Sequence, residues 1–344
     1  MPTPEVTVYE VGPRDGLQNE DAAVATNIKV ELIERLAEAG LPAVEATSFV
    51  HPKWVPQMAD AAAVIDKFHR RPGVRYPVLV PNEAGLRRAL DAGVNEIAIF
   101  GSVTETFARK NLNRTVGESM AMFAPVVERA HEAGLRVRGY LSMVFGDPWE
   151  GEVPVAQAAA AACRMCELGV DEVSLGDTIG VATPAHVRRV LAALNGDIPK
   201  EALAVHFHDT YGQALANVLV ALDLGVGIVD SAVGGLGGCP YAKSATGNLA
   251  TEDLVYMLNG LGVRTGVDLE AVVETAWWIN AGLSREPGGR VARALGLPSG
   301  AAAGQCEEGR GARPPVYGSS ALLVEDVDRV PSACARGGGL MPTV

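Results

Sequence analysis

The chain lacks basic runs, and it has no apolar run of transmembrane length. Asp and Glu together number 41 against 29 Lys and Arg, so the formal net charge is −12. An acidic chain without basic clusters argues against a protein that binds nucleic acid, although a local Arg or Lys can still serve an anionic small ligand. Even the Ala-rich stretch 155–163 is short and is followed by charge, so we expect no membrane segment.

A secretory signal is also missing, and cysteine is scarce. Residues 1–6 (MPTPEV) contain neither a basic region nor an apolar region. The five cysteines are odd in number and scattered, which is typical of reduced thiols. Cys163 and Cys166 form a Cys-X-X-Cys on an Ala-rich helix, but without a second pair we interpret them as small core residues. We therefore predict a cytoplasmic protein.

What the chain does contain is a regular alternation of strand and helix patterns. Repeated strand-then-helix units imply parallel strands, and eight of them imply an α/β fold of the (β/α)8 TIM-barrel type. The expected strands are 5–10, 43–47, 74–80, 95–100, 135–141, 171–175, 202–207 and 227–231. The expected helices between them are 27–39, 56–69, 83–92, 117–133, 154–168, 184–194 and 212–223.

Glycines punctuate this pattern at the ends of the helices. A glycine that can close a helix before the next strand recurs five times, at Gly40, Gly93, Gly134, Gly169 and Gly225. Further helices are expected near 250–260 and 268–282. From about residue 299 the periodicity is lost, and the segment is predicted to be a flexible tail. We divide the chain into a barrel with its C-terminal helices, 1–285, and a C-terminal extension, 286–344, flexible from about 300.

A pair of histidines stands out in the seventh expected strand. His206 and His208 are two residues apart in Val205–Asp209 (VHFHD), so both imidazoles point to the same face of a strand. A His-X-His alone is a weak signal. Asp15 in Gly12–Gly16 (GPRDG) and the amide of Asn248 add oxygen ligands. Such a mixed set suits a hard or borderline divalent cation better than a thiolate zinc site.

Other polar residues gather where this fold places its active sites, at the carboxyl ends of the strands. They are Arg14 and Asp15 after the first strand, Glu45 on the second, Asp177 after the sixth, the two histidines on the seventh, and Cys239 and Asn248 after the eighth. Cys239 follows a glycine run, 234–238, that is neither a Walker motif nor a dinucleotide fingerprint. The run is interpreted either as a tight turn only or as a mobile catalytic loop.

At these motifs the chain closely resembles the 3-hydroxy-3-methylglutaryl-CoA (HMG-CoA) lyase family, over roughly residues 5–285. The wider group comprises metal-dependent lyases and Claisen-type synthases on a TIM barrel, and the cysteine loop separates the lyases from the synthases. The tail does not resemble the end of the family. The motifs are Gly12–Glu20 (GPRDGLQNE), Val44–Val50 (VEATSFV), Ser174–Thr183 (SLGDTIGVAT), Val205–Asn217 (VHFHDTYGQALAN) and Gly235–Asp253 (GLGGCPYAKSATGNLATED).

The resemblance implies an enzyme that cleaves HMG-CoA into acetyl-CoA and acetoacetate, in leucine degradation and ketone-body metabolism, as a homodimer or other homo-oligomer. It implies Mg²⁺ or Mn²⁺ as the cofactor and an acyl-CoA thioester as the partner. The implied metal ligands are Asp15, His206, His208 and Asn248; the implied substrate-binding residues are Arg14 and Gln18; and the implied catalytic thiol is that of Cys239.

Some roles and functions stay open at this point. Asp15 and Asp177 are both candidates for the initial base, while Glu45 is expected to orient the metal site. Arg109 and Lys110 either meet the phosphates of CoA or form a solvated helix start. The same catalytic set would serve a longer branched 3-hydroxyacyl-CoA. A condensing synthase and a non-catalytic binding barrel are the remaining alternatives.

Overall fold

Nine strand segments form one parallel sheet in the computed structural model, which describes residues 6–21, 23–238 and 247–296. The sheet order is β2-β1-β11-β10-β9-β6-β5-β4-β3. The strands are β1 (Thr7–Glu10), β2 (Ala43–Val44), β3 (Thr47–Ser48), β4 (Val78–Leu79), β5 (Glu96–Ser102), β6 (Arg136–Ser142), β9 (Glu172–Asp177), β10 (Leu203–Phe207) and β11 (Ile228–Ser231).

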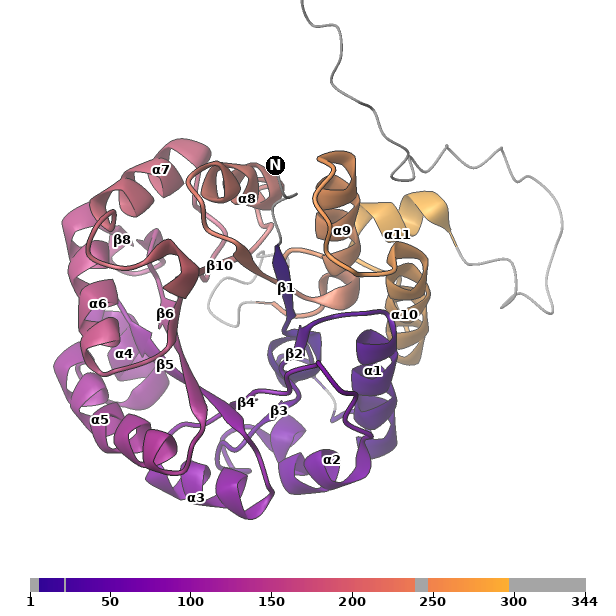
Figure 1. Cartoon of the computed structure of the whole chain (residues 1–344), viewed down its shortest axis with the longest axis horizontal. Helices are drawn as coiled ribbons and strands as arrows, with labels where there is room; N and C mark the ends of the chain where they lie inside the picture. Colours follow the sequence, from indigo (N-terminus) through magenta and orange to yellow (C-terminus); the bar gives the residue numbers. More distant parts are fainter. Residues whose placement is uncertain (1–5, 22, 239–246, 297–344) are drawn as a thin grey trace, which may run out of the picture.

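The two ends of this sheet order are the two halves of a single strand, which closes the sheet into a ring (Figure 1). β2 pairs with β1, β3 pairs with β4, and only Glu45 and Ala46 separate β2 from β3. Ladder hydrogen bonds continue through this break, since the Glu45 amide donates to the Glu10 carbonyl at 2.8 Å and the Ala46 amide donates to the Pro77 carbonyl at 2.9 Å. The eight-stranded TIM barrel expected from the sequence is therefore confirmed.

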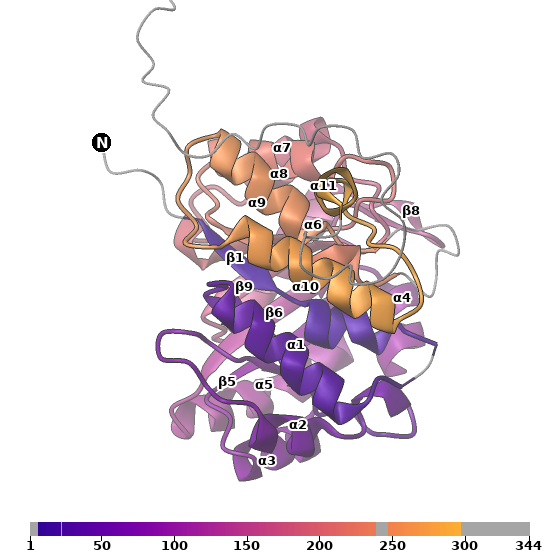
Figure 2. The ribbon, with the colours of Figure 1, turned by 90° about the vertical axis from the view of Figure 1, so that its right-hand side faces the viewer.

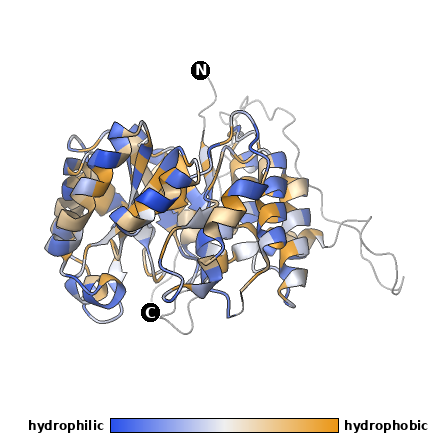
Figure 3. Cartoon of the chain, turned by 90° about the horizontal axis from the view of Figure 1, so that it is seen from below, coloured by the Kyte–Doolittle hydropathy of each residue, from blue (hydrophilic) through white to orange (hydrophobic). Residues whose placement is uncertain are grey.

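Helices surround the barrel and show mixed hydrophilic and hydrophobic surfaces, as expected for helices that cover a sheet on one side (Figure 3). Among the described residues, no helix is both long enough and apolar enough to cross a membrane. The helices are α1 (Thr26–Glu38), α2 (Ala61–Lys67), α3 (Glu83–Asp91), α4 (Glu105–Leu112), α5 (Val116–Glu132), α6 (Val155–Glu167), α7 (Pro184–Ala193), α8 (Ala214–Asp223), α9 (Thr251–Gly260), α10 (Leu269–Gly282) and α11 (Arg290–Leu295).

The recurring glycines end the helices as predicted. Gly40, Gly93, Gly134, Gly169 and Gly225 all have positive φ, between 71° and 92°. Each amide also donates to the carbonyl three residues earlier, for example from Gly40 to Ala37 at 3.2 Å. Glycine adopts this left-handed conformation without steric cost, so each helix stops and the chain turns into the next strand.

Several elements were not expected from the sequence. They include the short helix α4, a hairpin of β7 (Gly146–Asp147) with β8 (Gly151–Glu152), and α11. α11 lies within the segment assigned to the extension, yet it contacts α9 and α10, and the Trp277 indole donates to the Ala292 carbonyl at 3.0 Å. Figure 2 shows these three helices on one side of the barrel, with α10 beside α1. The boundary at residue 285 and the flexibility from about 300 stay predictions, and the tail from 297 lies outside the described residues.

Candidate metal centre

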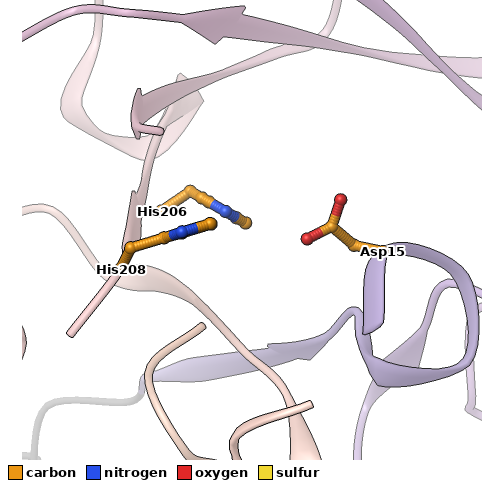
Figure 4. A group of neighbouring side chains, drawn as sticks. All are labelled: Asp15, His206 and His208. Atoms are coloured by element: carbon orange, nitrogen blue, oxygen red, sulfur yellow. The ribbon is translucent and has the colours of Figure 1, made fainter. Parts of the chain in front are cut away.

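Two imidazoles and one carboxylate meet at the carboxyl end of the barrel. His206 is on β10 and His208 follows it directly, and Figure 4 shows both rings extending toward Asp15. One ligand atom from each of the three residues lies within 4.8 Å of the others. The alternation of a β-strand therefore puts both histidines on one face, as the sequence predicted.

Asp15 lies on a single turn of π-helix, η1 (Gly12–Gly16), that follows β1. Burial alone would raise the pKa of Asp15, but the charge of Arg14 and the two imidazoles lower it to about 2. Burial also lowers the pKa of His208 to about 4, and the neighbouring His206 acts in the same direction. The site thus presents an ionised carboxylate and a neutral imidazole, the forms that bind a metal.

Asn248 joins the group through the backbone and through its amide. It forms an isolated antiparallel bridge with His208, and its Nδ2 donates to Asp15 Oδ2 at 2.8 Å and to the Leu236 carbonyl at 3.1 Å. Within the part of the chain that the structure describes, the buried Asn248 Oδ1 has no hydrogen-bond partner, and neither has His208 Nδ1. A buried acceptor without a partner is costly unless something else binds it.

These donor atoms fit a divalent cation. A carboxylate and two imidazoles lie within 4.8 Å of one another, Asn248 contacts that carboxylate through Nδ2, and its unpartnered Oδ1 is an oxygen that a cation would satisfy. Asp230 on β11 supports the set because its Oδ2 lies 3.1 Å from His206 Nδ1. That contact leaves Nε2 of His206 for a metal, a common arrangement around ligating histidines.

Arg14 and Glu45 form a buried ion pair beside the carboxylate. The Arg14 guanidinium donates to Asp15 Oδ1 at 2.6 Å and to Glu45 Oε2 at 2.8 Å, and it lies 5.2 Å from the centre of the Tyr140 ring. The Tyr140 hydroxyl also donates to Glu45 Oε2 at 2.8 Å. Glu45 therefore holds the guanidinium, while Arg14 Nε is buried without a partner among the described residues. The role of Glu45 in orienting the metal site stays a prediction.

Sequence reasoning missed four charged or polar residues that support this site, namely Glu10, Arg138, Tyr140 and Asp230. Arg138 is fully buried inside the barrel, where it pairs with Asp230 Oδ1 at 2.5 Å and with Glu172 Oε1 at 3.1 Å. The available signal was a charged residue within an expected strand, Arg138 in 135–141 and Asp230 in 227–231, because a buried charge needs a partner.

Glu10 connects the first and last loops of the barrel. Its Oε1 accepts from the amides of Gly12 at 2.8 Å and Val233 at 3.0 Å, and its Oε2 accepts from the Thr251 hydroxyl at 2.6 Å. Gly12 begins η1, and Val233 begins the turn η4 (Val233–Gly235) at the start of the glycine run. This single side chain therefore ties the loop that carries Asp15 to the glycine run.

The glycine run itself lies against Asn248 and η1. A Cβ on Gly237 would lie 2.7 Å from Asn248 Nδ2, and a Cβ on Gly16 would lie 2.7 Å from the Leu236 Cβ. A Cβ on Gly247 would lie 2.5 Å from the carbonyl oxygens of Gly235 and Gly237. The glycines are thus required by close approach of backbone and side chains. Cys239 lies outside the described residues.

Asp177 ends β9, beside the strand that carries His206. Its two oxygens accept from the amides of Val181 and Ala182 at 2.9 and 3.0 Å, so it fixes the turn that follows. Burial raises its pKa to about 6. A carboxylate in this state can still accept a proton near neutrality.

The predicted substrate-binding residues Gln18, Arg109 and Lys110 are not among the residues that form the metal centre. Gln18 follows η1, and its Oε1 is buried with no partner among the described residues. Arg109 and Lys110 are exposed on α4, which begins after the carboxyl end of β5, and Lys110 Nζ lies 4.8 Å from the centre of the Trp149 ring. The structure places them outside the metal centre, so their contact with a substrate stays a prediction.

Comparison with known proteins agrees with the family resemblance seen in the sequence motifs. A family model described as HMGL-like matches residues 5–279. The chain is 54% identical over 290 residues to hydroxymethylglutaryl-CoA lyase, mitochondrial, of Mus musculus, with 84% of this chain and 89% of the relative covered. It is 52% identical over 289 residues to 3-hydroxy-3-methylglutaryl-CoA lyase, cytoplasmic, of Homo sapiens, with coverage of 84% and 78%.

A solved structure agrees with these sequence relatives. Hydroxymethylglutaryl-CoA lyase from Pseudomonas aeruginosa superposes with a TM-score of 0.83 at 49% identity, covering 86% of this chain and 99% of that chain. Solved structures below 25% identity, such as the carboxyl transferase domain of pyruvate carboxylase from Rhizobium etli at 18% and a TM-score of 0.61, share the fold. The similarity at high identity thus spans the whole barrel, including the segments that build the site.

Proposed function

This chain belongs to the HMGL-like family, and from that membership we propose that it is a carbon–carbon lyase that cleaves HMG-CoA to acetyl-CoA and acetoacetate. The observation that carries the proposal is the meeting of Asp15, His206 and His208 within 4.8 Å, in a chain about half identical to lyases of this name. The substrate is an acyl-CoA thioester with a tertiary alcohol at C3. The reaction breaks the C2–C3 bond as the alcohol oxygen becomes a ketone oxygen.

The cofactor proposed is Mg²⁺ or Mn²⁺, held by Asp15, His206, His208 and Asn248. When bound, such an ion polarises the alcohol and lowers the barrier to its deprotonation. The protein prepares for this by keeping Asp15 ionised and His208 neutral. Asp230 holds the His206 ring from behind, so the ligand orientation is set before the cation arrives.

Arg14 is assigned to the thioester end of the substrate. Breaking the C2–C3 bond places negative charge on the thioester oxygen, and a guanidinium can donate hydrogen bonds to it. Glu45, itself held by Tyr140, fixes the guanidinium in a buried position, so little reorganisation is needed as that charge develops. Gln18, next to η1, is proposed to bind the same substrate through its buried amide oxygen Oε1.

Asp15 and Asp177 remain the two candidates for the base that takes the alcohol proton. The low pKa of Asp15 makes it the weaker base, whereas burial raises the pKa of Asp177 to about 6 and suits it better to hold a proton. Asp177 would have to accept that proton while its oxygens also bind Val181 and Ala182. Cys239 is proposed as the acid that protonates C2 of the departing enolate, because a free thiol has a reference pKa of about 8.5 and can donate a proton near neutrality.

The remaining assignments concern the surroundings of the reaction. Arg109 and Lys110 are proposed to meet the phosphates of CoA at the mouth of the barrel. We further propose a homodimer or other homo-oligomer, acting in leucine degradation and ketone-body metabolism. The cytoplasm is proposed as its location because the cysteines are scattered, while the relatives include both mitochondrial and cytoplasmic forms.

An assay of the purified protein with defined metal tests this function. We expect release of acetyl-CoA and acetoacetate from HMG-CoA with Mg²⁺ or Mn²⁺, loss of turnover on chelation, and recovery when metal is returned. A panel that includes longer branched 3-hydroxyacyl-CoA substrates measures the acyl preference. Full turnover by rigorously metal-free protein would exclude the proposed metal centre, and no cleavage of HMG-CoA in the presence of metal would exclude the lyase assignment.

A further inference from the structure

The segment Arg285–Arg290, which joins α10 to α11 and is named the strap, binds loops at the carboxyl end of the barrel. The Gly288 amide donates to the Gly234 carbonyl at 2.8 Å, which fastens the strap to the glycine turn η4. At one end, the Arg285 guanidinium donates to the two carboxylate oxygens of Glu20 at 2.7 and 3.2 Å. Glu20 lies in the loop that follows the Asp15 turn, so the strap joins this loop to the glycine turn η4.

The other end of the strap reaches the histidine loop. Arg290 Nη1 donates to Asp209 Oδ2 at 2.8 Å, and Asp209 is the residue after His208. The Asp209 amide in turn donates to the Gly247 carbonyl at 3.3 Å, next to Asn248. Arg290 therefore contacts the residue that follows His208, and that residue contacts the one that precedes Asn248.

Under the strap lies the fully buried carboxyl group of Glu252. Its Oε2 accepts from the Gly234 amide at 2.9 Å. Its Oε1 lies so close to the strap that a Cβ on Gly289 would be 2.0 Å from it. Gly289 has φ −62° and ψ 135°, a conformation open to any residue, so only this close approach requires a glycine there.

Displacement of Glu252 would reach the metal ligands through the glycine turn. Glu252 holds Gly234, and two residues later the Leu236 carbonyl accepts from Asn248 Nδ2. Gly237 and Gly247 leave no room between this turn and Asn248. Close-packed backbone transmits small shifts, so the Asn248 amide would move with the turn.

We propose that the strap is a positioning element for the metal centre, with Gly289 and Arg290 as positioning residues for the lyase reaction. This inference rests on the proposed function, since it concerns the same metal. The strap sets where Asn248 Oδ1 and His208 lie before a cation binds. A substitution in the strap should therefore change the affinity for the metal more than it changes the stability of the barrel.

Metal titration of the full-length, metal-free Gly289→Ala protein tests the proposal. We expect the dissociation constant for Mn²⁺, measured by electron paramagnetic resonance, to rise about 10-fold or more. Gly282→Ala is the matched control, because a Cβ at that position in α10 meets nothing within 4 Å. The control should bind Mn²⁺ as wild type does. Equal Mn²⁺ affinity for Gly289→Ala and wild type would overturn the role of Gly289.

A double-mutant cycle shows whether the Cβ acts through Glu252. In a Glu252→Ala background the clash is gone, so Gly289→Ala should then leave the Mn²⁺ dissociation constant nearly unchanged. Additive losses would mean that Gly289 acts by another route and would overturn the mechanism. Wild-type protein that binds Mn²⁺ but does not cleave HMG-CoA would refute the proposed function alone, because the strap is tested by affinity.

Arg290 gives a second test on the surface, where folding is not at risk. Arg290→Ala should weaken Mn²⁺ binding several-fold, and Arg290→Lys should restore part of it, because the ion pair with Asp209 can re-form. Arg129→Ala is the control, since it breaks an exposed ion pair between Arg129 on α5 and Glu83 on α3. If Arg290→Ala and Arg129→Ala bind Mn²⁺ equally well, Arg290 has no positioning role.

Discussion

At the scale of single residues, a permanent cation lies beside the proposed cation site. Arg14 is buried, and its guanidinium bridges Asp15 and Glu45. Arginine is always charged and cannot itself ligate a metal, so its use must be toward negative charge. Arg14 and a metal ion would both bind the Asp15 carboxylate. They can coexist because Glu45 accepts one of the hydrogen bonds that the guanidinium donates.

Arg14→Gln tests this use. We expect kcat to fall by about 10²–10³-fold, the range found when one donor to a developing oxyanion is lost, with a much smaller rise in KM. Arg14→Lys should recover only part of the rate, because an ammonium lacks the planar fork. Steady-state kinetics with bound-metal analysis measures both variants. Loss of metal with normal turnover after reloading would show that Arg14 only supports the site.

The thiol of Cys239 is tested in the same way. Cys239→Ala should lose most of its turnover while it keeps its metal content and fold, because the proposed role is proton donation to C2. Cys163→Ala is the control, since Cys163 is a half-buried residue on α6. Wild-type kcat in Cys239→Ala would remove the cysteine from the mechanism.

At the scale of elements, buried carboxyl groups connect β1, η4 and the start of α9. Glu10 and Glu252 are both fully buried, and burial raises the pKa of Glu10 to about 7 and that of Glu252 to about 8. Both accept backbone amides of the turn that contacts Asn248. The elements that position the site are therefore joined by groups that can gain or lose a proton.

Glu252 makes stability depend on pH. Its pKa rises from 4.5 to about 8, so between these values the folded protein holds a proton that the unfolded chain has released. Its contribution is present below the lower value and is lost as pH rises through the upper one. Against Glu252→Gln, wild type should lose about 1.4 kcal/mol of unfolding free energy per pH unit within this window.

Urea unfolding at about pH 5.5 and pH 8 measures this difference between wild type and Glu252→Gln. Glu128→Gln, at an exposed position on α5, is the control and should run parallel to wild type at both pH values. A stability difference between wild type and Glu252→Gln that is the same at both pH values would contradict the raised pKa.

At the scale of the whole molecule, the barrel is covered beyond its eighth strand by α9, α10 and α11. Ala292 on α11 is fully buried, and Asp253 accepts from the amides of Arg290 and Val291 at 3.0 and 2.7 Å. These contacts attach residues 290–295 to the barrel. We therefore expect any separation between the barrel and an extension to lie after α11, whereas the sequence pattern predicted it at residue 285.

Two truncations test this assignment. A chain that ends at residue 300 should bind metal and unfold within about 2 °C of the full chain, because the tail lacks the periodicity needed to pack. A chain that ends at residue 285 should unfold more than about 5 °C lower, since each kcal/mol lost shifts the midpoint by roughly 2–4 °C. Thermal unfolding and Mn²⁺ titration measure both. Failure of the chain ending at 300 to fold would show that the tail is part of the barrel.

The eight-stranded barrel, its helices and its glycine caps were predictable because they depend on local patterns. The periodicity of a strand or helix, and the glycine at a helix end, can be recognised from a few neighbouring residues. The short helices α4 and α11 were missed because six to eight residues carry too little periodicity. The meeting of Asp15, His206 and His208 was also predictable, since parallel strands bring their carboxyl ends to one side.

By itself, the sequence determined the barrel, the family and the histidine pair. The barrel follows from the short-range periodicity of strands and helices, and the family and the histidine pair follow from motifs that are contiguous in the sequence. Only the tertiary structure decided what surrounds the ligands. Asp230 behind His206, Glu10 between two distant loops, and the strap against Glu252 join residues far apart in the chain. A contact between distant residues depends on how whole elements pack, and no local pattern of residues records that.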